Sequence, residues 1–227
     1  MKIQKYVLIT LIILYSISGF SQSKNNSGYS IGLKLLSVEE LPKFFNEVRT
    51  GSKYEVIPYF GAMLKYTDNQ ISYRLVVSNS SIKDYSIKNE CETCEVMMGK
   101  YKSTTVKIGF EKSSTYTRLQ PFFGTDIGFK LASFNGDASD SNSSTFLYKA
   151  YSEKTGAIFY PFVGLKYTFT KFLTLSAETG IDFLYSYDKE VKSFPGTASP
   201  YSNRVFRWNY NFKPLGLLSL QFNFGER

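Results

Sequence analysis

Hydrophobic residues occupy most odd-numbered positions from residue 157 to residue 187, on both sides of a short turn near Thr170. Successive side chains of a β-strand point to opposite faces, so each arm of this hairpin has one apolar face and one polar, small or charged face. The odd-numbered, mostly apolar positions include Phe159, Leu165 and Phe183, and the even-numbered positions include Lys166. The pattern predicts a sheet that meets a different environment on each face.

A soluble β-sandwich has the same period of two, so alternation alone does not identify the environment. The long arms, the aromatic residues near the ends of the apolar stripe, and the short turn opposite long polar loops favour a transmembrane barrel. The alternative is a soluble lipocalin-like barrel in the periplasm. In that barrel the apolar stripe would point inward, around a ligand.

The same alternation recurs along the chain and predicts strands over residues 28–36, 54–67, 71–78, 104–111, 115–134, 157–170, 173–187 and 204–224. In the last segment the apolar residues stay on even-numbered positions from residue 204 to residue 224, through Pro214. We interpret it as one strand and not as a hairpin, because bacterial barrels have even strand numbers and short periplasmic turns. The predicted fold is therefore all-β, an eight-stranded antiparallel up-and-down transmembrane β-barrel. Both termini are then periplasmic.

The predicted outer loops are residues 37–53, 79–103, 135–156 and 188–203. In the first of them, Ser37 and Glu40 have the spacing of a capping box, and Leu41, Phe44, Phe45 and Val48 recur at helical spacing. We expect a short amphipathic helix there, limited to about two turns by Pro42. An irregular loop is the alternative.

The first residues have the pattern of a secretory signal: Lys2 and Lys5, an apolar core over residues 6–17, and a cleavage site between Ser21 and Gln22. The predicted organisation is a signal peptide at 1–21, a short polar segment at 22–27 and an outer-membrane β-barrel domain at 28–227. An aromatic content of 17% suits the aromatic girdles of such a barrel. The mean hydropathy of -0.19 is no objection, because only every second residue of a barrel meets lipid.

The formal charge of +8 could suggest a nucleic-acid partner. Export makes that improbable, so we expect no nucleic acid. The expected partners are outer-membrane lipid and lipopolysaccharide phosphates, which Lys and Arg residues would face.

Charged residues of the inward parity predict ion pairs inside the barrel. An eight-stranded barrel is about wide enough for side chains to fill it, and buried charges must be paired. The cluster assigned to the lumen is Lys65, Arg74, Lys107, Glu111, Asp126, Lys130, Lys166, Glu178, Asp182 and Arg207, and the same parity also carries Lys34, Glu55 and Arg118. A plugged lumen is the prediction, and a narrow porin-like channel is the alternative.

Cys91 and Cys94 form the motif C-E-T-C, which could suggest metal or redox chemistry in a reducing compartment. Two cysteines cannot complete a zinc site, and the chain contains no His, so we expect a local disulfide, no metal and no cofactor. Most barrel enzymes use a His as general base. We therefore expect no enzyme activity.

The whole mature chain resembles the small outer-membrane barrels of the OmpA/OmpX type, in the form common in Bacteroidota. The most specific part of the resemblance is the end of the chain, where Leu218, Leu220, Phe222 and Phe224 look like the signal that the barrel-assembly machinery reads. Gly225, Glu226 and Arg227 follow the last aromatic residue, whereas the family ends on it. The resemblance implies a location in the bacterial outer membrane but no particular activity. Because neither an enzyme nor an open channel is expected, what remains is a structural or surface-binding role in which the outer loops carry any specificity.

Overall fold

The structure is a computed structural model that describes residues 27–45, 47, 53–88, 95–115, 117–141 and 145–224. These residues form the strands β1 (Ser27–Glu40), β2 (Tyr54–Asp68), β3 (Ile71–Lys88), β4 (Glu95–Ser113), β5 (Leu119–Asp140), β6 (Phe146–Thr170), β7 (Leu173–Ser193) and β8 (Tyr201–Phe224). No helix in this part of the chain is long and apolar enough to cross a bilayer.

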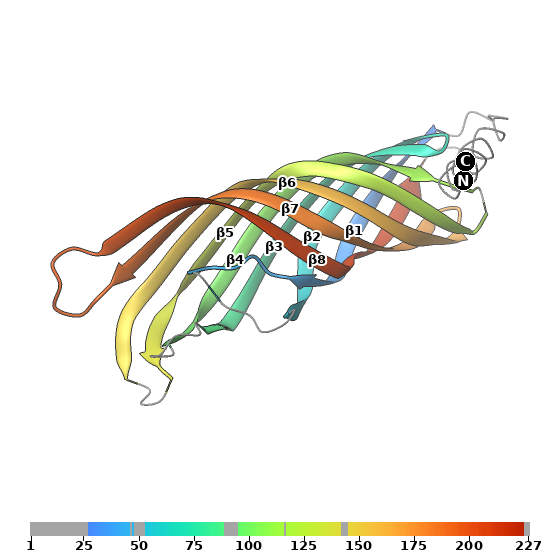
Figure 1. Cartoon of the computed structure of the whole chain (residues 1–227). Coiled ribbons are helices and arrows are strands. Elements are labelled where there is room, and N and C mark those ends of the chain that lie inside the picture. The colour runs from blue at the N-terminus through green and yellow to red at the C-terminus, as the bar shows by residue number, and fades with distance from the viewer. Residues whose placement is uncertain are drawn as a thin grey trace, which may run out of the picture.

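The strands close into a barrel in which each strand is antiparallel to its neighbours (Figure 1). Ile31 of β1 lies opposite Leu64 of β2 on one side and opposite Phe222 of β8 on the other, so β1 closes the ring. The predicted antiparallel up-and-down barrel is confirmed. We call the end where β1 begins and β8 ends the terminal end, and the opposite end the far end.

The strand β8 passes through Pro214 without a turn, as the parity of the sequence predicted. Its pairing with β1 ends at Leu215, and its ladder with β7 is irregular between Lys213 and Leu217. Pro214 therefore lies where its missing N–H group removes little from either ladder.

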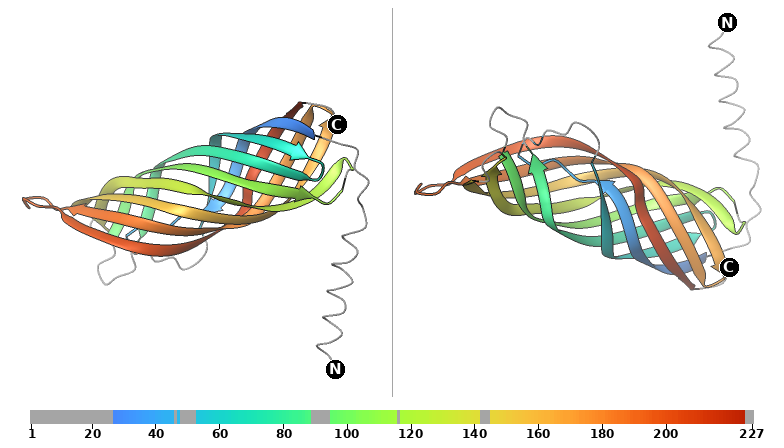
Figure 2. Two further views of the ribbon diagram at one scale, coloured as in Figure 1. Left: turned by 90° about the horizontal axis from the view of Figure 1, so that it is seen from above. Right: turned by 90° about the horizontal axis from the view of Figure 1, so that it is seen from below.

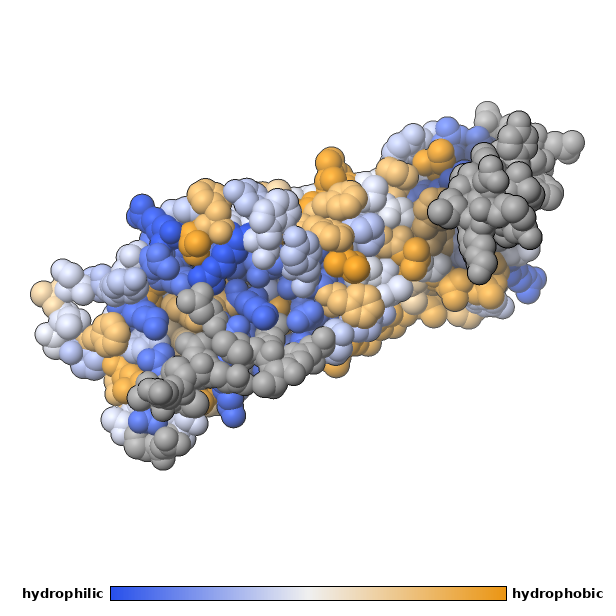
Figure 3. All heavy atoms as spheres, viewed as in Figure 1, coloured by the Kyte–Doolittle hydropathy of each residue, from blue (hydrophilic) through white to orange (hydrophobic). Residues whose placement is uncertain are grey.

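The two faces of the wall have the predicted orientation. Phe123 and Leu165 are 50% and 53% exposed on the outside, whereas Asp126 and Glu178 are 0% and 4% exposed inside the barrel. The inverted arrangement of a lipocalin-like barrel is therefore wrong for these strands. On the face shown in Figure 3, hydrophobic residues gather over the middle of the barrel and toward its terminal end.

Strands β3 to β8 extend much further than predicted at the far end. Most of the predicted loop 79–103 belongs to β3 and β4, and β5 to β8 likewise extend into the predicted loops 135–156 and 188–203. The alternation continues there with the opposite sense: Lys102 points outward, while Tyr101 and Phe134 are buried inside. Polar outward residues were mistaken for loop residues. Figure 2 shows the β7–β8 hairpin reaching furthest from the terminal end.

The predicted helix after the first strand is wrong for the residues that the structure describes. Strand β1 continues to Glu40 through the supposed capping box at Ser37, and residues 41–44 are neither helix nor strand. Leu41, Phe44 and Phe45 are 1%, 1% and 3% exposed because they pack into the far end of the barrel. Their spacing reflects this burial and not a helical face.

The wall of the barrel is incomplete on the side of β1 and β2. Pairing between β2 and β3 stops at Phe60 and Asn79, although β3 continues to Lys88. In the same way, the pairing of β8 with β1 does not extend over Tyr201 to Pro214. In Figure 1 the segment that follows β1 runs across the barrel at this level. Among the described residues, the far half of the barrel is thus bounded by β3 to β8 alone.

Candidate functional site

Arg74 of β3 is the centre of an ion-pair network in the barrel lumen. Its Nε and Nη2 atoms donate to the two carboxylate oxygens of Asp126 at 2.7 and 2.6 Å. Its Nη1 atom donates to Glu178 Oε2 at 2.6 Å. The guanidinium carbon also lies 3.6 Å from the centre of the Phe162 ring, which is a cation–π contact. One side chain therefore joins β3, β5, β6 and β7 across the lumen.

Glu111 of β4 holds a second group of charges beside Arg74. Its carboxylate lies 2.6 Å from Lys65 Nζ and 3.1 Å from Lys166 Nζ. The Nη1 atom of Arg74 is 3.6 Å away from it. Glu111 itself is 0% exposed, so its charge is stabilised by these cations and not by bulk water.

A third group of charges continues the network toward the far end. Lys213 Nζ lies 2.8 Å from Asp182 Oδ2 and also pairs with Glu39. Lys107 Nζ is 3.7 Å from Asp126 and lies 3.7 Å above the ring of Tyr160. These contacts fill the cross-section of the barrel with paired charges and aromatic rings.

Hydroxyl and amide groups line the lumen at the terminal end, on the side of β1, β7 and β8. Asn223 accepts a hydrogen bond from Ser30 at 2.8 Å and donates to Thr174 at 3.0 Å. Gln221 donates to Ser176 at 2.6 Å. The polar groups on this side of the lumen therefore satisfy one another.

An apolar cluster fills the far end of the barrel. The far-end cluster consists of Leu41, Phe44, Phe45, Ile57, Tyr85, Ile87, Met97, Tyr101, Ala132, Phe134, Ala138, Tyr148 and Ala150. The Phe44 ring meets the rings of Tyr101 and Phe134 at centroid distances of 5.9 and 6.1 Å. The N–H group of Phe45 donates to Glu190 Oε1 at 3.1 Å, which fixes the segment after β1 in this position.

The structure brings most of the predicted lumen residues together, with some exceptions. Arg207 lies apart from the Arg74 network and pairs with Glu190 at 3.1 Å. Lys130 is 4% exposed, and no carboxylate of the described residues lies within ion-pair distance of it. Glu55 pairs with Lys53, and Arg118 is exposed at the terminal end.

Several buried charges were not among the predicted lumen residues. Lys213 has the inward parity of β8, so its position was available from the pattern, but the possible turn at Pro214 obscured it. Lys154, Asp188 and Glu190 fell in segments interpreted as loops. Lys154 pairs with Asp188, and both side chains are 1% exposed.

Some predicted features lie outside the residues that the structure describes. These are the signal peptide at 1–21 with its cleavage site, the polar segment at 22–26, Val48, Cys91 and Cys94, and residues 225–227. Leu218, Leu220, Phe222 and Phe224 are described and lie at the terminal end of β8. Among the described residues, no group of three or more His, Cys, Asp or Glu side chains is arranged to hold a metal ion.

Comparison with solved structures gives matches to outer-membrane barrels. A major outer membrane protein from Thermus thermophilus covers 88% of this chain and 100% of its own length, with a TM-score of 0.52 and 10% identity. The chain has the fold of a small outer-membrane β-barrel protein. The outer membrane protein OprG from Pseudomonas aeruginosa matches with a TM-score of 0.47, 11% identity and coverage of 87% and 93%. The Escherichia coli outer membrane protein W matches with a TM-score of 0.36 and 11% identity, and the match covers 89% of this chain and 99% of that protein.

Comparison by sequence adds no closer relative. No protein-family model matches the chain, and no curated protein matches it. The likeness to solved structures therefore concerns the fold, and the function must be argued from the residues of this chain.

Proposed function

We propose that the chain spans the outer membrane as a barrel with its terminal end in the periplasm and its far end outside. Apolar side chains cover the outer surface of the barrel between its terminal end and its middle. They include Ile31, Leu64, Ile108, Phe123 and Leu165, each at least 45% exposed. A continuous apolar surface of this kind is costly in water and suits hydrocarbon. The short turn at residues 171–172 lies at the terminal end, as periplasmic turns do.

Export and assembly belong to the same proposal. Residues 1–21 would be removed between Ser21 and Gln22, and residues 28–227 would form the barrel domain. The outward Leu218, Leu220, Phe222 and Phe224 would present the assembly machinery with its recognition signal. Cys91 and Cys94 would form a disulfide at the outer surface, where the compartment is oxidising.

The barrel acts as a closed structural or surface-binding protein in this proposal, without a catalytic role. The observation that carries it is the pair of contacts from Arg74 to Asp126 and Glu178, which bridge the lumen at 2.6 Å on each side. An ion crossing the membrane would have to break charge-assisted hydrogen bonds among groups that are almost fully buried.

Conductance measurements test the closed lumen. The refolded protein, inserted in planar bilayers, is expected to show no steady openings in the nanosiemens range. Heat-modifiable migration of the same preparation on unboiled gels confirms that folded barrel is present. Regular openings of the unmodified protein would overturn the proposal and establish a channel. Fractionation of the native protein with the soluble periplasm would overturn the membrane location.

A second candidate function is the binding of an apolar small molecule at the far end. It is favoured by the far-end cluster, which lies where β1 and β2 leave the wall incomplete and where Phe44 and Phe45 occupy the interior. Barrel in lipid nanodiscs would then take up an apolar fluorescent dye saturably, above the uptake of empty nanodiscs. Equal uptake by empty nanodiscs would contradict this candidate.

A further inference from the structure

The outer faces of β7 and β8 form a ladder of directly opposed side chains. From the middle of the barrel toward the far end, the opposed pairs are Ile181–Phe212, Phe183–Tyr210, Tyr185–Trp208, Tyr187–Phe206 and Lys189–Arg204. The pairs are therefore mostly aromatic in the middle of the barrel and cationic toward its far end. We call Tyr185, Tyr187, Phe206 and Trp208 the aromatic ledge.

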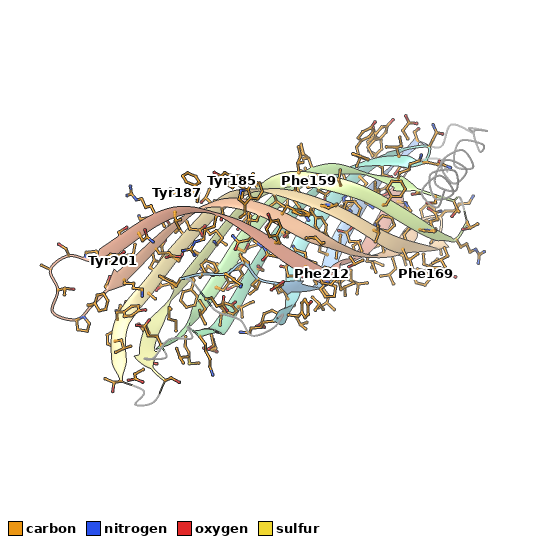
Figure 4. All side chains as sticks on the ribbon, in the orientation of Figure 1. Phe159, Phe169, Tyr185, Tyr187, Tyr201 and Phe212 are labelled. Atoms are coloured by element: carbon orange, nitrogen blue, oxygen red, sulfur yellow. The ribbon has the colours of Figure 1, made fainter. Side chains whose placement is uncertain are left out.

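The rings of the aromatic ledge contact one another and leave one broad surface uncovered. Tyr185 lies 4.8 Å from Trp208 and 5.8 Å from Phe206, measured between ring centroids, and its plane is within 14° of that of Phe206. Phe206 and Trp208 are 62% and 61% exposed. Figure 4 shows Tyr185 and Tyr187 projecting away from the barrel. The ledge is thus a preformed aromatic surface on the outside of the wall.

The two cations next to the ledge have no carboxylate partner among the residues that the structure describes. Lys189 and Arg204 are opposed across the β7–β8 ladder. The nearest carboxylate in register is Glu153 on β6, opposite Lys189, and it accepts the hydroxyl hydrogen of Tyr151. Two neighbouring cations without a bound anion repel each other, so an anionic ligand would find a favourable site between them.

The wall formed by β4 and β5 lacks this combination. At the far end of β4 and β5 the outward positions carry Lys100, Lys102, Ser133 and Asn135, without an aromatic rung. Aromatic side chains favour the boundary between hydrocarbon and head groups, and cations favour the phosphates just beyond it. The β7–β8 face presents both, in that order along the barrel.

We infer that the aromatic ledge, with Lys189 and Arg204, binds the phosphorylated sugar head group of a glycolipid in the outer leaflet. The cations contact the phosphate, and the rings stack against the sugar and the first part of the acyl chains. This inference rests on the proposed location in the outer membrane. It names the lipid partner and the side of the barrel that holds it.

Binding of the glycolipid can be followed by intrinsic fluorescence, because Trp208 is the one Trp of the chain. Refolded full-length barrel in nanodiscs of phosphatidylcholine is titrated with diphosphorylated lipid A, and the emission of Trp208 is recorded. A saturable blue shift is expected. Phosphatidylglycerol at the same mole fraction supplies the charge without the sugar and is expected to give a much smaller shift.

The variant Lys189→Gln/Arg204→Gln is expected to bind lipid A at least about tenfold more weakly, because it removes both cations that contact the phosphate and with them the charge-assisted hydrogen bonds. The matched control is Lys102→Gln/Lys149→Gln, which removes the same charge from exposed positions of β4 and β6 and should leave the affinity unchanged. A second variant, Phe206→Ala, removes one ring and leaves both cations, and it should also weaken binding. Heat-modifiable migration verifies that each variant is folded.

An equal response to phosphatidylglycerol, or equal losses in the two double variants, would overturn the site. A folded barrel that inserts in nanodiscs but shows no response of Trp208 to lipid A would also overturn it, while leaving the proposed membrane location intact. A protein that does not insert in nanodiscs at all and stays soluble would instead overturn the proposed function. The two failures are therefore distinguishable.

Discussion

Arg74 Nη1 and Glu178 Oε2 lie 2.6 Å apart and join strands β3 and β7 across the lumen of the barrel. The two side chains are 1% and 3% exposed. Because neither charge can be solvated by bulk water, the arrangement is stable only while both partners are present. This contact therefore ties β3 to β7 inside the barrel, and the stability of the fold should depend on it.

Replacing Arg74 by Ala should destabilise the barrel by about 3–5 kcal/mol, because Asp126 and Glu178 lose their main cation and remain buried. The free energy of unfolding in urea, followed by the emission of Trp208 in lipid vesicles, measures the effect. Arg118→Ala is the control, since Arg118 is exposed at the terminal end. Similar stabilities for the two variants would show that the Arg74 network does not hold the barrel together.

The half of the barrel near the terminal end could be predicted from the alternation because its outward positions are apolar and its inward positions are polar or charged. Arg74, Glu111, Asp126 and Glu178 were placed in the lumen by this rule alone, and they lie there. The rule does not reveal which charges touch, since pairing depends on the register between strands. Lys130 is an example: the alternation correctly places it inside the barrel, but it forms no ion pair with a carboxylate of the described residues.

The far end could not be predicted in the same way, because there the apolar side chains point into the barrel and the polar side chains point outward. Toward the far end the outward positions carry polar residues such as Lys102, and apolar residues such as Tyr101 and Phe134 turn inward. A search for one apolar stripe therefore ends each strand too early. The segment with Phe44 was mistaken for a helix for a related reason, since its partners come from β4 and β5 and are distant in sequence.

Gly216 provides a steric test of the lumen packing. A Cβ atom built on Gly216 would lie 2.0 Å from the Tyr160 hydroxyl oxygen. Tyr160 is 0% exposed and stacks on Phe162 at a centroid distance of 5.6 Å, so its ring has little room to move. Gly216→Ala should therefore cost about 1–3 kcal/mol of stability through overpacking.

Removing the hydroxyl group should relieve this clash. The oxygen of Tyr160 has no hydrogen-bond partner among the described residues, so Tyr160→Phe alone should be nearly neutral or slightly stabilising. In the Tyr160→Phe background the cost of Gly216→Ala should fall. A double-mutant cycle on urea unfolding measures the coupling between the two substitutions. Additive effects would show that the new methyl group at position 216 does not clash with the Tyr160 hydroxyl.

Phe44 should control how firmly the segment after β1 is held inside the barrel. Phe44→Ala removes a ring that is 1% exposed and leaves a cavity against Tyr101 and Phe134, which should release the segment locally while the strands stay paired. The exposed Lys43 then becomes a site of tryptic cleavage in the folded protein. The control is Phe172→Ala, which removes a ring that is 72% exposed at the terminal end. Cleavage after Lys43 should rise severalfold in the first variant only, measured by mass spectrometry of a limited digest. Equal cleavage in both variants would mean that the ring of Phe44 does not anchor the segment.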